Sequence, residues 1–236
     1  SAGDGSNAVI PYSIMGALVL LIAVIFSRVN LPEIQHTDDK ETQQGGHNIS
    51  RLFKNRSFVF GLSALLAYEV AEISINSYFI NYVTGQGWME PATASTVLTV
   101  GLGLFMLARF IGAAVMSNVP AEKYLLICAV GTVACIAVLL LDMGRNISMA
   151  ALMMNYFFEA IMFPTIFSLT LDGLGRLTKS ASSILMMTPV GGCGFLLMGL
   201  IADRTDNFLL PFFIPLVGFA IVLAYAMRKR AFLKKA

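Results

Sequence analysis

The sequence has little charge and few of the side chains that build metal or redox sites. Only 13% of its 236 residues are charged and 57% are hydrophobic, whereas about a quarter of the residues in a soluble domain are charged. It holds two histidines and three cysteines, with no CxxC pair and no Cys/His cluster. This scarcity argues against a soluble domain and predicts no metal site. We expect the three thiols, which fall within apolar runs, to be packed and reduced.

The sequence also lacks the usual motifs of enzymes. The apolar segments contain no HExxH, no GxSxG and no suitable pair of aspartates. The stretch GLGRLTKS (173–180) departs from the spacing of a phosphate-binding loop, and Gly101-Leu-Gly103 lies inside a long apolar run. We therefore expect no enzymatic activity, no cofactor and no nucleic-acid partner.

Long apolar runs are what the sequence has in abundance. A run of about 20 apolar residues crosses the hydrocarbon core of a bilayer as a helix. Seven such runs predict an all-α polytopic membrane protein: 8–27, 58–82, 92–117, 123–141, 148–171, 181–202 and 207–227. Most connectors are short and predict antiparallel neighbours. The exception is 28–57, a polar, Gly- and Gln-rich stretch that predicts a flexible linker without a core.

The lysines and arginines gather on one side of these spans. With the linker in the cytoplasm, that side holds thirteen basic residues, including a tail at 228–236, and the opposite side holds only Arg145 and Arg204. Basic loops stay in the cytoplasm, so we expect a cytoplasmic linker and C-terminus. The sequence shows no signal peptide and begins without Met, and we expect it to be a fragment.

One span, a long basic linker and six tightly connected spans match the second half of a twelve-helix transporter. Such proteins join two six-helix bundles, each made of two inverted three-helix repeats. The predicted parts are then 1–27 as the sixth helix, 28–57 as the linker and 58–227 as the carboxyl-terminal bundle. A seven-helix receptor is the alternative, although the last span has no lysine for a retinal Schiff base.

Polar side chains within the spans mark the candidate site. Glu69, Glu72, Asn76 and Ile80 follow the spacing of one helix face, and Asn155 and Glu159 share a face in a later span. Ionisable residues in a membrane are costly and usually functional. These two spans are the first helices of the two repeats, so their stripes border the expected central cavity.

Two interpretations of the carboxylates stay open. They can hold helices together, or they can line a substrate pathway. A carboxyl group taken out of water and placed near a second one favours its protonated form, which suits proton coupling and equally suits a neutral grip on a hydroxylated substrate. Arg109, near the end of its span, can reach the interface or pair with a carboxylate.

Helix breakers occupy two spans. Pro164 lies late in one, and PVGGCGFLLMG (189–199), with Gly191 and Gly192, lies in another. Small residues allow close approach of helices, and interruptions often serve moving helices. Pro164, Gly191, Gly192 and Arg109 are therefore the candidate structural or gating residues, with static packing as the alternative for each glycine.

Several segments resemble the fucose permease-like branch of the major facilitator superfamily. FPTIFSLTLDGLGRLTKSASSILMM (163–187) is similar to its segment after the tenth helix, and AEISINSYFINY (71–82) to its seventh helix. ARFIGAAVM (108–116), GGCGFLLMGLIAD (191–203) and SRVNLPEI (27–34) resemble further elements, so the resemblance spans nearly the whole chain.

The resemblance implies helices six to twelve of a monosaccharide carrier in a bacterial inner membrane. It implies a sugar of the fucose, galactose or glucose class, a co-transported proton, a lipid bilayer and an amino-terminal six-helix half as partners. Glu72 and Asn81 match residues typical of the family, whereas Glu69 and Glu159 depart from it. The family's proton-binding carboxylates are implied to lie in the amino-terminal half, which leaves Glu72 a sugar-binding or structural role.

Overall fold

The structure is a computed structural model that describes residues 5–28 and 45–233. It divides into two units, residues 1–42 and 43–236. The first unit contains one helix, α1 (Gly5–Arg28), whose side chains from Ser13 to Ile25 are apolar or small and exposed. The predicted equivalence of this helix to the sixth of twelve stays a prediction, and residues 29–44 of the predicted linker lie outside the described residues.

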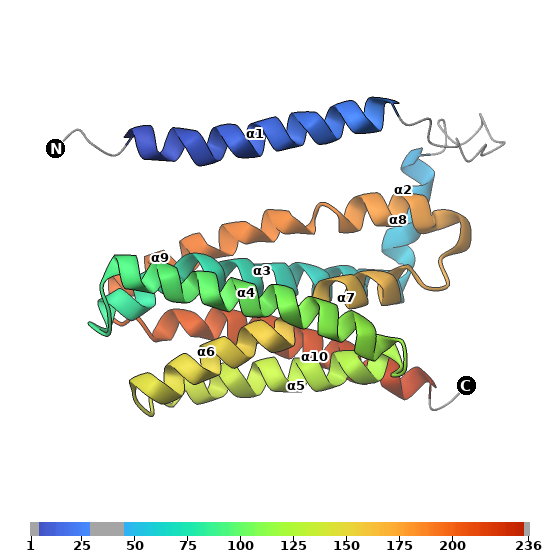
Figure 1. The fold of residues 1–236 in the computed structure, drawn as a ribbon. Helices are drawn as coiled ribbons and strands as arrows, with labels where there is room; N and C mark the ends of the chain where they lie inside the picture. The colour runs from blue at the N-terminus through green and yellow to red at the C-terminus, as the bar shows by residue number, and fades with distance from the viewer. Residues whose placement is uncertain (1–4, 29–44, 234–236) are drawn as a thin grey trace. The chain divides into compact units, whose positions relative to one another are not determined.

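The second unit is a bundle of long apolar helices (Figure 1). Its elements are α2 (Gly45–Lys54), α3 (Arg56–Gly85), α4 (Pro91–Met116), α5 (Ala121–Leu140), α6 (Arg145–Glu159), α7 (Met162–Leu171), η1 (Gly175–Leu177), α8 (Thr178–Leu185), η2 (Thr188–Cys193), α9 (Gly194–Thr205), η3 (Leu210–Phe212) and α10 (Phe213–Leu233). Every element in the described residues is helical, which confirms the all-α prediction.

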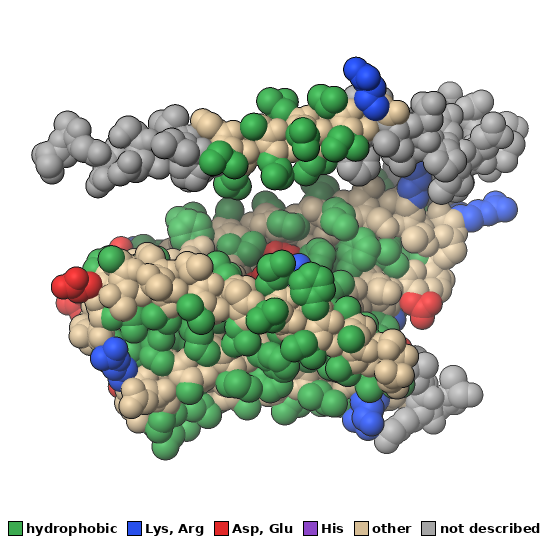
Figure 2. Space-filling model, in the orientation of Figure 1, with side chains coloured by type: hydrophobic (Ala, Val, Ile, Leu, Met, Phe, Trp, Pro, Cys, Tyr) green, Lys and Arg blue, Asp and Glu red, His purple; other side chains and the backbone are tan. Residues whose placement is uncertain are grey.

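Six segments of the bundle are long and apolar enough to cross a membrane. They run over 56–85, 91–116, 121–140, 145–171, 175–205 and 210–231. Each overlaps one of the runs predicted from the sequence, with limits that differ by at most six residues, because a spanning helix needs about 20 apolar residues. Figure 2 shows hydrophobic side chains covering the flank of this bundle, as expected for a surface that faces lipid.

The residues 45–54 differ from the predicted linker, because they form the helix α2 and bury Leu52 completely. The next residue, Asn55, starts α3: its side-chain Oδ1 accepts the backbone N–H groups of Ser57 and Phe58 at 3.0 and 3.3 Å. An asparagine in this position satisfies donors that a helix start leaves free. The capping Asn55 thus ends one helix and begins the next without a flexible stretch between them.

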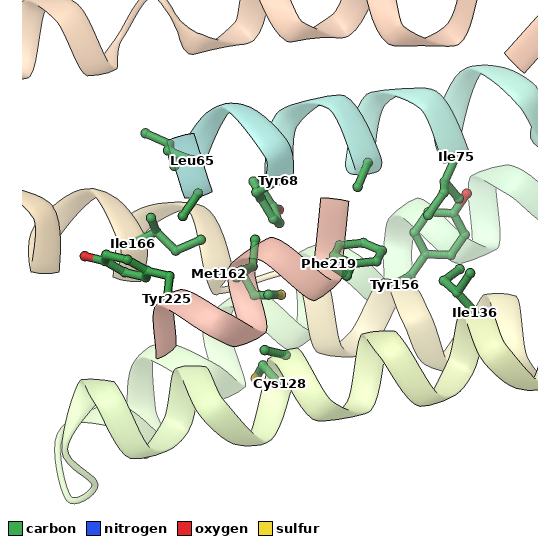
Figure 3. Close-up of a cluster of buried hydrophobic side chains, with 14 of the residues drawn as sticks. Leu65, Tyr68, Ile75, Cys128, Ile136, Tyr156, Met162, Ile166, Phe219 and Tyr225 are labelled. Atoms are coloured by element: carbon green, nitrogen blue, oxygen red, sulfur yellow. The ribbon is translucent and has the colours of Figure 1, made fainter. Parts of the chain in front are cut away.

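The core of the bundle lies around α3. This helix packs against α10, α7, α4, α9 and η2, and α10 also packs against α5. Figure 3 shows side chains of α3, α5, α6, α7 and α10 meeting there. The labelled members include Leu65, Tyr68, Cys128, Tyr156, Met162, Phe219 and Tyr225. Of the three thiols expected to be packed, Cys128 is buried and Cys135 half-buried, but Cys193 is exposed at the end of η2.

Two of the six spans are interrupted. Within 145–171, α6 ends at Glu159 and α7 begins at Met162. Within 175–205, the 3₁₀ segment η2 separates α8 from α9. The sequence predicts breakers in both spans, but the first break lies ahead of Pro164 rather than at it.

Candidate functional site

The polar stripe predicted on the second span lies on the unbroken helix α3. Glu69 is 6% exposed, while Glu72, Asn76 and Ile80 are half-buried. The Oδ1 atom of Asn76 has no hydrogen-bond partner among the described residues. Asn76 therefore keeps one buried oxygen with capacity for a further partner, and Glu72 lies partly exposed on the same helix.

Asn155 and Glu159 lie on α6 and are completely buried. Asn155 Nδ2 donates to Glu159 Oε2 at 2.7 Å, as their spacing of one helical turn allows. Asn155 Oδ1 and Glu159 Oε1 have no partner among the described residues. The sequence leaves substrate lining and helix packing open as roles for these residues, and neither side chain is open to a solute in this conformation, because α4 and α5 pack against α6.

The break between α6 and α7 has a definite chemical origin. Proline lacks a backbone N–H and its ring clashes with the carbonyl group four residues earlier. For Pro164 that carbonyl belongs to Ala160, which lies in the two-residue turn between α6 and α7. The helix therefore opens directly after Glu159, and the buried carbonyl oxygens at the turn need other donors.

Two side chains from neighbouring helices supply those donors. Arg109 Nε, on α4, donates to the Ala160 carbonyl oxygen at 3.0 Å. Tyr68 Oη, on α3, donates to the Glu159 carbonyl oxygen at 2.9 Å. From the sequence we expect Arg109 to reach the membrane interface or to pair with a carboxylate. In the structure its hydrogen bond goes to a backbone oxygen instead. Its guanidinium also lies 4.8 Å from the Phe105 ring centre.

The same turn brings the predicted carboxylates into one electrostatic group. Glu72 interacts with Tyr68 and Arg109, Glu69 interacts with Glu72 and Arg109, and Glu159 interacts with Glu72. Three helices thus contribute to one site: α3 with its acidic stripe, α4 with Arg109, and the broken end of α6. We name these six residues the turn cluster: Tyr68, Glu69, Glu72, Arg109, Asn155 and Glu159.

Tyr68 is the member of the turn cluster that we do not predict from the sequence, because a tyrosine in an apolar run gives no signal of its own. The signal that could have found it is indirect: a proline inside a buried helix leaves a carbonyl oxygen that some side chain must satisfy. Tyr156 is similar. It is buried, its hydroxyl has no partner among the described residues, and it interacts with Glu159 and Glu72.

Gly191 and Gly192 lie in η2, away from the turn cluster in sequence, and pack against α3. A Cβ atom added at Gly191 would lie 3.0 Å from Val70 Cγ2, and one added at Gly192 would lie 3.0 Å from Ile73 Cδ1. Both glycines therefore permit a close approach of η2 to α3. Their role in gating stays a prediction.

Among the described residues, no three His, Cys, Asp or Glu side chains lie close enough to hold a metal ion. The acidic groups of the turn cluster are accompanied by amide, phenol and guanidinium groups, which are hydrogen-bonding partners for hydroxylated molecules rather than a cage for a cation.

Comparison with known proteins gives related sugar transporters. The chain is 30% identical over 230 residues to a putative glucose/galactose transporter of Helicobacter pylori, and the match covers 95% of this chain and 55% of that protein. It is 30% identical over 221 residues to the L-fucose-proton symporter of Escherichia coli, covering 92% of this chain and 50% of the symporter. No protein-family model matches the sequence.

The fold has a close counterpart among solved structures. The crystal structure of the major facilitator superfamily transporter FucP in the outward conformation matches with a TM-score of 0.81 at 29% identity, over 93% of this chain and 54% of FucP. The chain therefore spans about half the length of the relatives and of the structure it matches. None of these comparisons favours the seven-helix receptor.

Proposed function

We propose that the chain is the carboxyl-terminal half of a secondary transporter of the major facilitator superfamily, which carries a monosaccharide together with a proton. The named relatives support a sugar of the glucose, galactose or fucose class and proton coupling. A transport role without catalysis agrees with their names. The protein would work with an amino-terminal six-helix half, and the two halves would rock about the substrate.

The observation that supports this proposal most directly is the half-buried polar stripe on α3. Glu72 and Asn76 are both partly exposed on a bundle whose flank carries many hydrophobic side chains, and the buried Asn76 Oδ1 atom has no hydrogen-bond partner among the described residues. A carboxyl group and an amide are suitable partners for sugar hydroxyls, and leaving such a group unpaired in a closed site is costly. We propose that Glu72 and Asn76 contact the sugar and that Glu69 acts on them indirectly, through its electrostatic interaction with Glu72.

The buried pair Asn155–Glu159 has an indirect role in this proposal. Its carboxyl group interacts electrostatically with Glu72, and the Glu159 carbonyl oxygen accepts a hydrogen bond from Tyr68. Movement of α7 relative to α6 at the turn would change the surroundings of both carboxyl groups. A direct sugar contact by Asn155 or Glu159 would require the break to open further than in this conformation.

We propose a bacterial inner membrane as the location, with the linker and C-terminus in the cytoplasm. Six candidate spans and transporter relatives support a multi-pass membrane protein. The basic residues support the orientation: Lys54, Lys123 and Arg176 lie at the end of the bundle where α3 begins, whereas Arg145 and Arg204 lie at the opposite end.

Uptake of labelled hexoses by cells that carry the full-length protein tests the function, with and without a protonophore. We expect uptake of at least one hexose that the protonophore abolishes. Glu72→Gln should lower that uptake by about tenfold or more at equal membrane abundance, as loss of a charge-assisted hydrogen bond predicts. Glu90→Gln is the matched control, because Glu90 is exposed in the connector before α4 and should leave uptake unchanged.

Failure of every hexose to be taken up would contradict the proposed function. Normal uptake by Glu72→Gln would contradict only the site, since the carrier would then work without that carboxylate.

A further inference from the structure

The helix α2 has one face in the bundle and one outside it. Leu52 is completely buried, and α2 packs against α3 and α8. Ile49 and Phe53, one helical turn apart and beside Leu52 on the same apolar face, are 44% and 52% exposed. The Phe53 ring also contacts the Phe58 ring edge to face, at 6.4 Å between centres, which holds this aromatic side chain in place. A fixed, exposed pair of large apolar side chains indicates a site that contacts another protein, a ligand or a membrane.

Cations flank this apolar pair. Arg51 and Lys54 are exposed on α2, and Arg56 is exposed at the start of α3. No described residue forms a hydrogen bond or ion pair with the Arg51 or Lys54 side chain. An amphipathic helix with large apolar residues on one face and cations beside them is the pattern of helices that lie in a membrane interface.

The position of α2 agrees with that pattern. Only Asn55 separates α2 from α3, so α2 lies where a membrane span begins. Figure 1 shows α2 crossing the end of the bundle rather than running along the long helices. The same end carries exposed cations at the starts of other helices, namely Lys123, Arg176 and Lys179.

We propose that α2 is an interfacial helix that binds anionic phospholipid. Ile49 and Phe53 enter the boundary between headgroups and acyl chains, and Arg51 and Lys54 extend to the lipid phosphates. Charge complementarity selects the lipid, because cations near an anionic surface each contribute about a fivefold preference. This inference depends on the bundle lying in a membrane and holds whatever the transporter carries.

The experiment places a dansyl amino acid at position 53 of the full-length protein in nanodiscs. Nitroxide-labelled phosphatidylglycerol or phosphatidylcholine is added as a minor component, and quenching of the dansyl group reports contact with each lipid. We expect both lipids to quench and phosphatidylglycerol to quench at a lower mole fraction. Arg51→Gln with Lys54→Gln should reduce this preference by about fivefold for each cation.

The matched control removes the two cations at the opposite end, Arg145→Gln with Arg204→Gln, and should leave the preference at position 53 unchanged. Inorganic phosphate, compared with sodium chloride at equal ionic strength, separates the lipid from a soluble anion. If phosphate reduced the quenching by phosphatidylglycerol more than chloride did, Arg51 and Lys54 would bind a soluble anion. That result would overturn the proposal. Equal quenching by both lipids would also overturn the proposal, because the helix would then show no preference for anionic lipid. No quenching by either lipid would overturn it by showing that protein covers position 53.

Discussion

At the scale of single residues, Arg109 has a role that its charge does not suggest. Its Nε atom satisfies the Ala160 carbonyl oxygen that Pro164 deprives of its helical donor. Replacing it leaves a polar group at a buried turn without a partner, which costs about 1–3 kcal/mol. We predict that Arg109→Gln lowers the thermal midpoint of the full-length protein in detergent and speeds amide exchange between residues 160 and 165.

A double-mutant cycle separates this role from a general loss of charge. Pro164→Ala restores a backbone N–H that can reach the Ala160 carbonyl oxygen, so Arg109→Gln should cost less in the Pro164→Ala background. Arg145→Gln, which removes an exposed cation at the start of α6, should change neither measurement. Equal costs of Arg109→Gln in both backgrounds would show that the guanidinium does not act through this carbonyl oxygen.

The pairing of Asn155 with Glu159 is the part of the candidate site that spacing alone anticipates, because side chains one turn apart meet on a helix. The contacts of Tyr68 and Arg109 with backbone oxygens are not available from spacing. These contacts depend on which residues of α3 and α4 face the turn. The same apolar helices could pack in many ways that bring other residues to the turn, so the sequence does not specify the contacts.

At the scale of elements, close helix approach depends on particular glycines. A Cβ atom added at Gly131 on α5 would lie 2.6 Å from the Phe158 ring on α6, at its Cγ atom, whereas one added at Gly103 on α4 meets nothing within 4 Å. We predict that Gly131→Ala destabilises the protein by about 1–3 kcal/mol, the usual cost of overpacking. Gly103→Ala should be neutral or stabilising, because alanine is the better helix former by about 1 kcal/mol.

Thermal unfolding of both variants in the same detergent checks this difference. A Gly131→Ala protein as stable as Gly103→Ala would mean that α5 and α6 do not approach as closely as described here.

The span limits are predictable from the sequence because lipid imposes a minimum apolar length on each helix. The helix interruptions and the helix α2 are harder to predict from the sequence. Pro164 acts on the carbonyl group of Ala160 rather than at its own position, and so the break precedes it. In α2, the polar and glycine-rich composition of the surrounding stretch hides a short apolar face made by Ile49, Leu52 and Phe53.

At the scale of the whole molecule, the half-length coverage of the relatives leads to the last prediction. Glu72 and Asn76 belong to a chain that covers 54% of FucP, so a substrate held by them would have protein on one side only. Alternating access needs a second bundle to close the opposite side of the site. A polypeptide of these 236 residues produced alone should therefore insert in the membrane but support no hexose uptake above that of empty cells.

Co-expression with the preceding half of the full-length protein as a separate polypeptide should restore uptake, if the two bundles associate without a covalent connection. The restored uptake should keep its sensitivity to Glu72→Gln, since the same carboxylate would face the reassembled pathway. Uptake by the 236-residue polypeptide alone, sensitive to Glu72→Gln, would contradict the division of labour between two halves. It would show instead that copies of this bundle pair with one another to enclose the sugar.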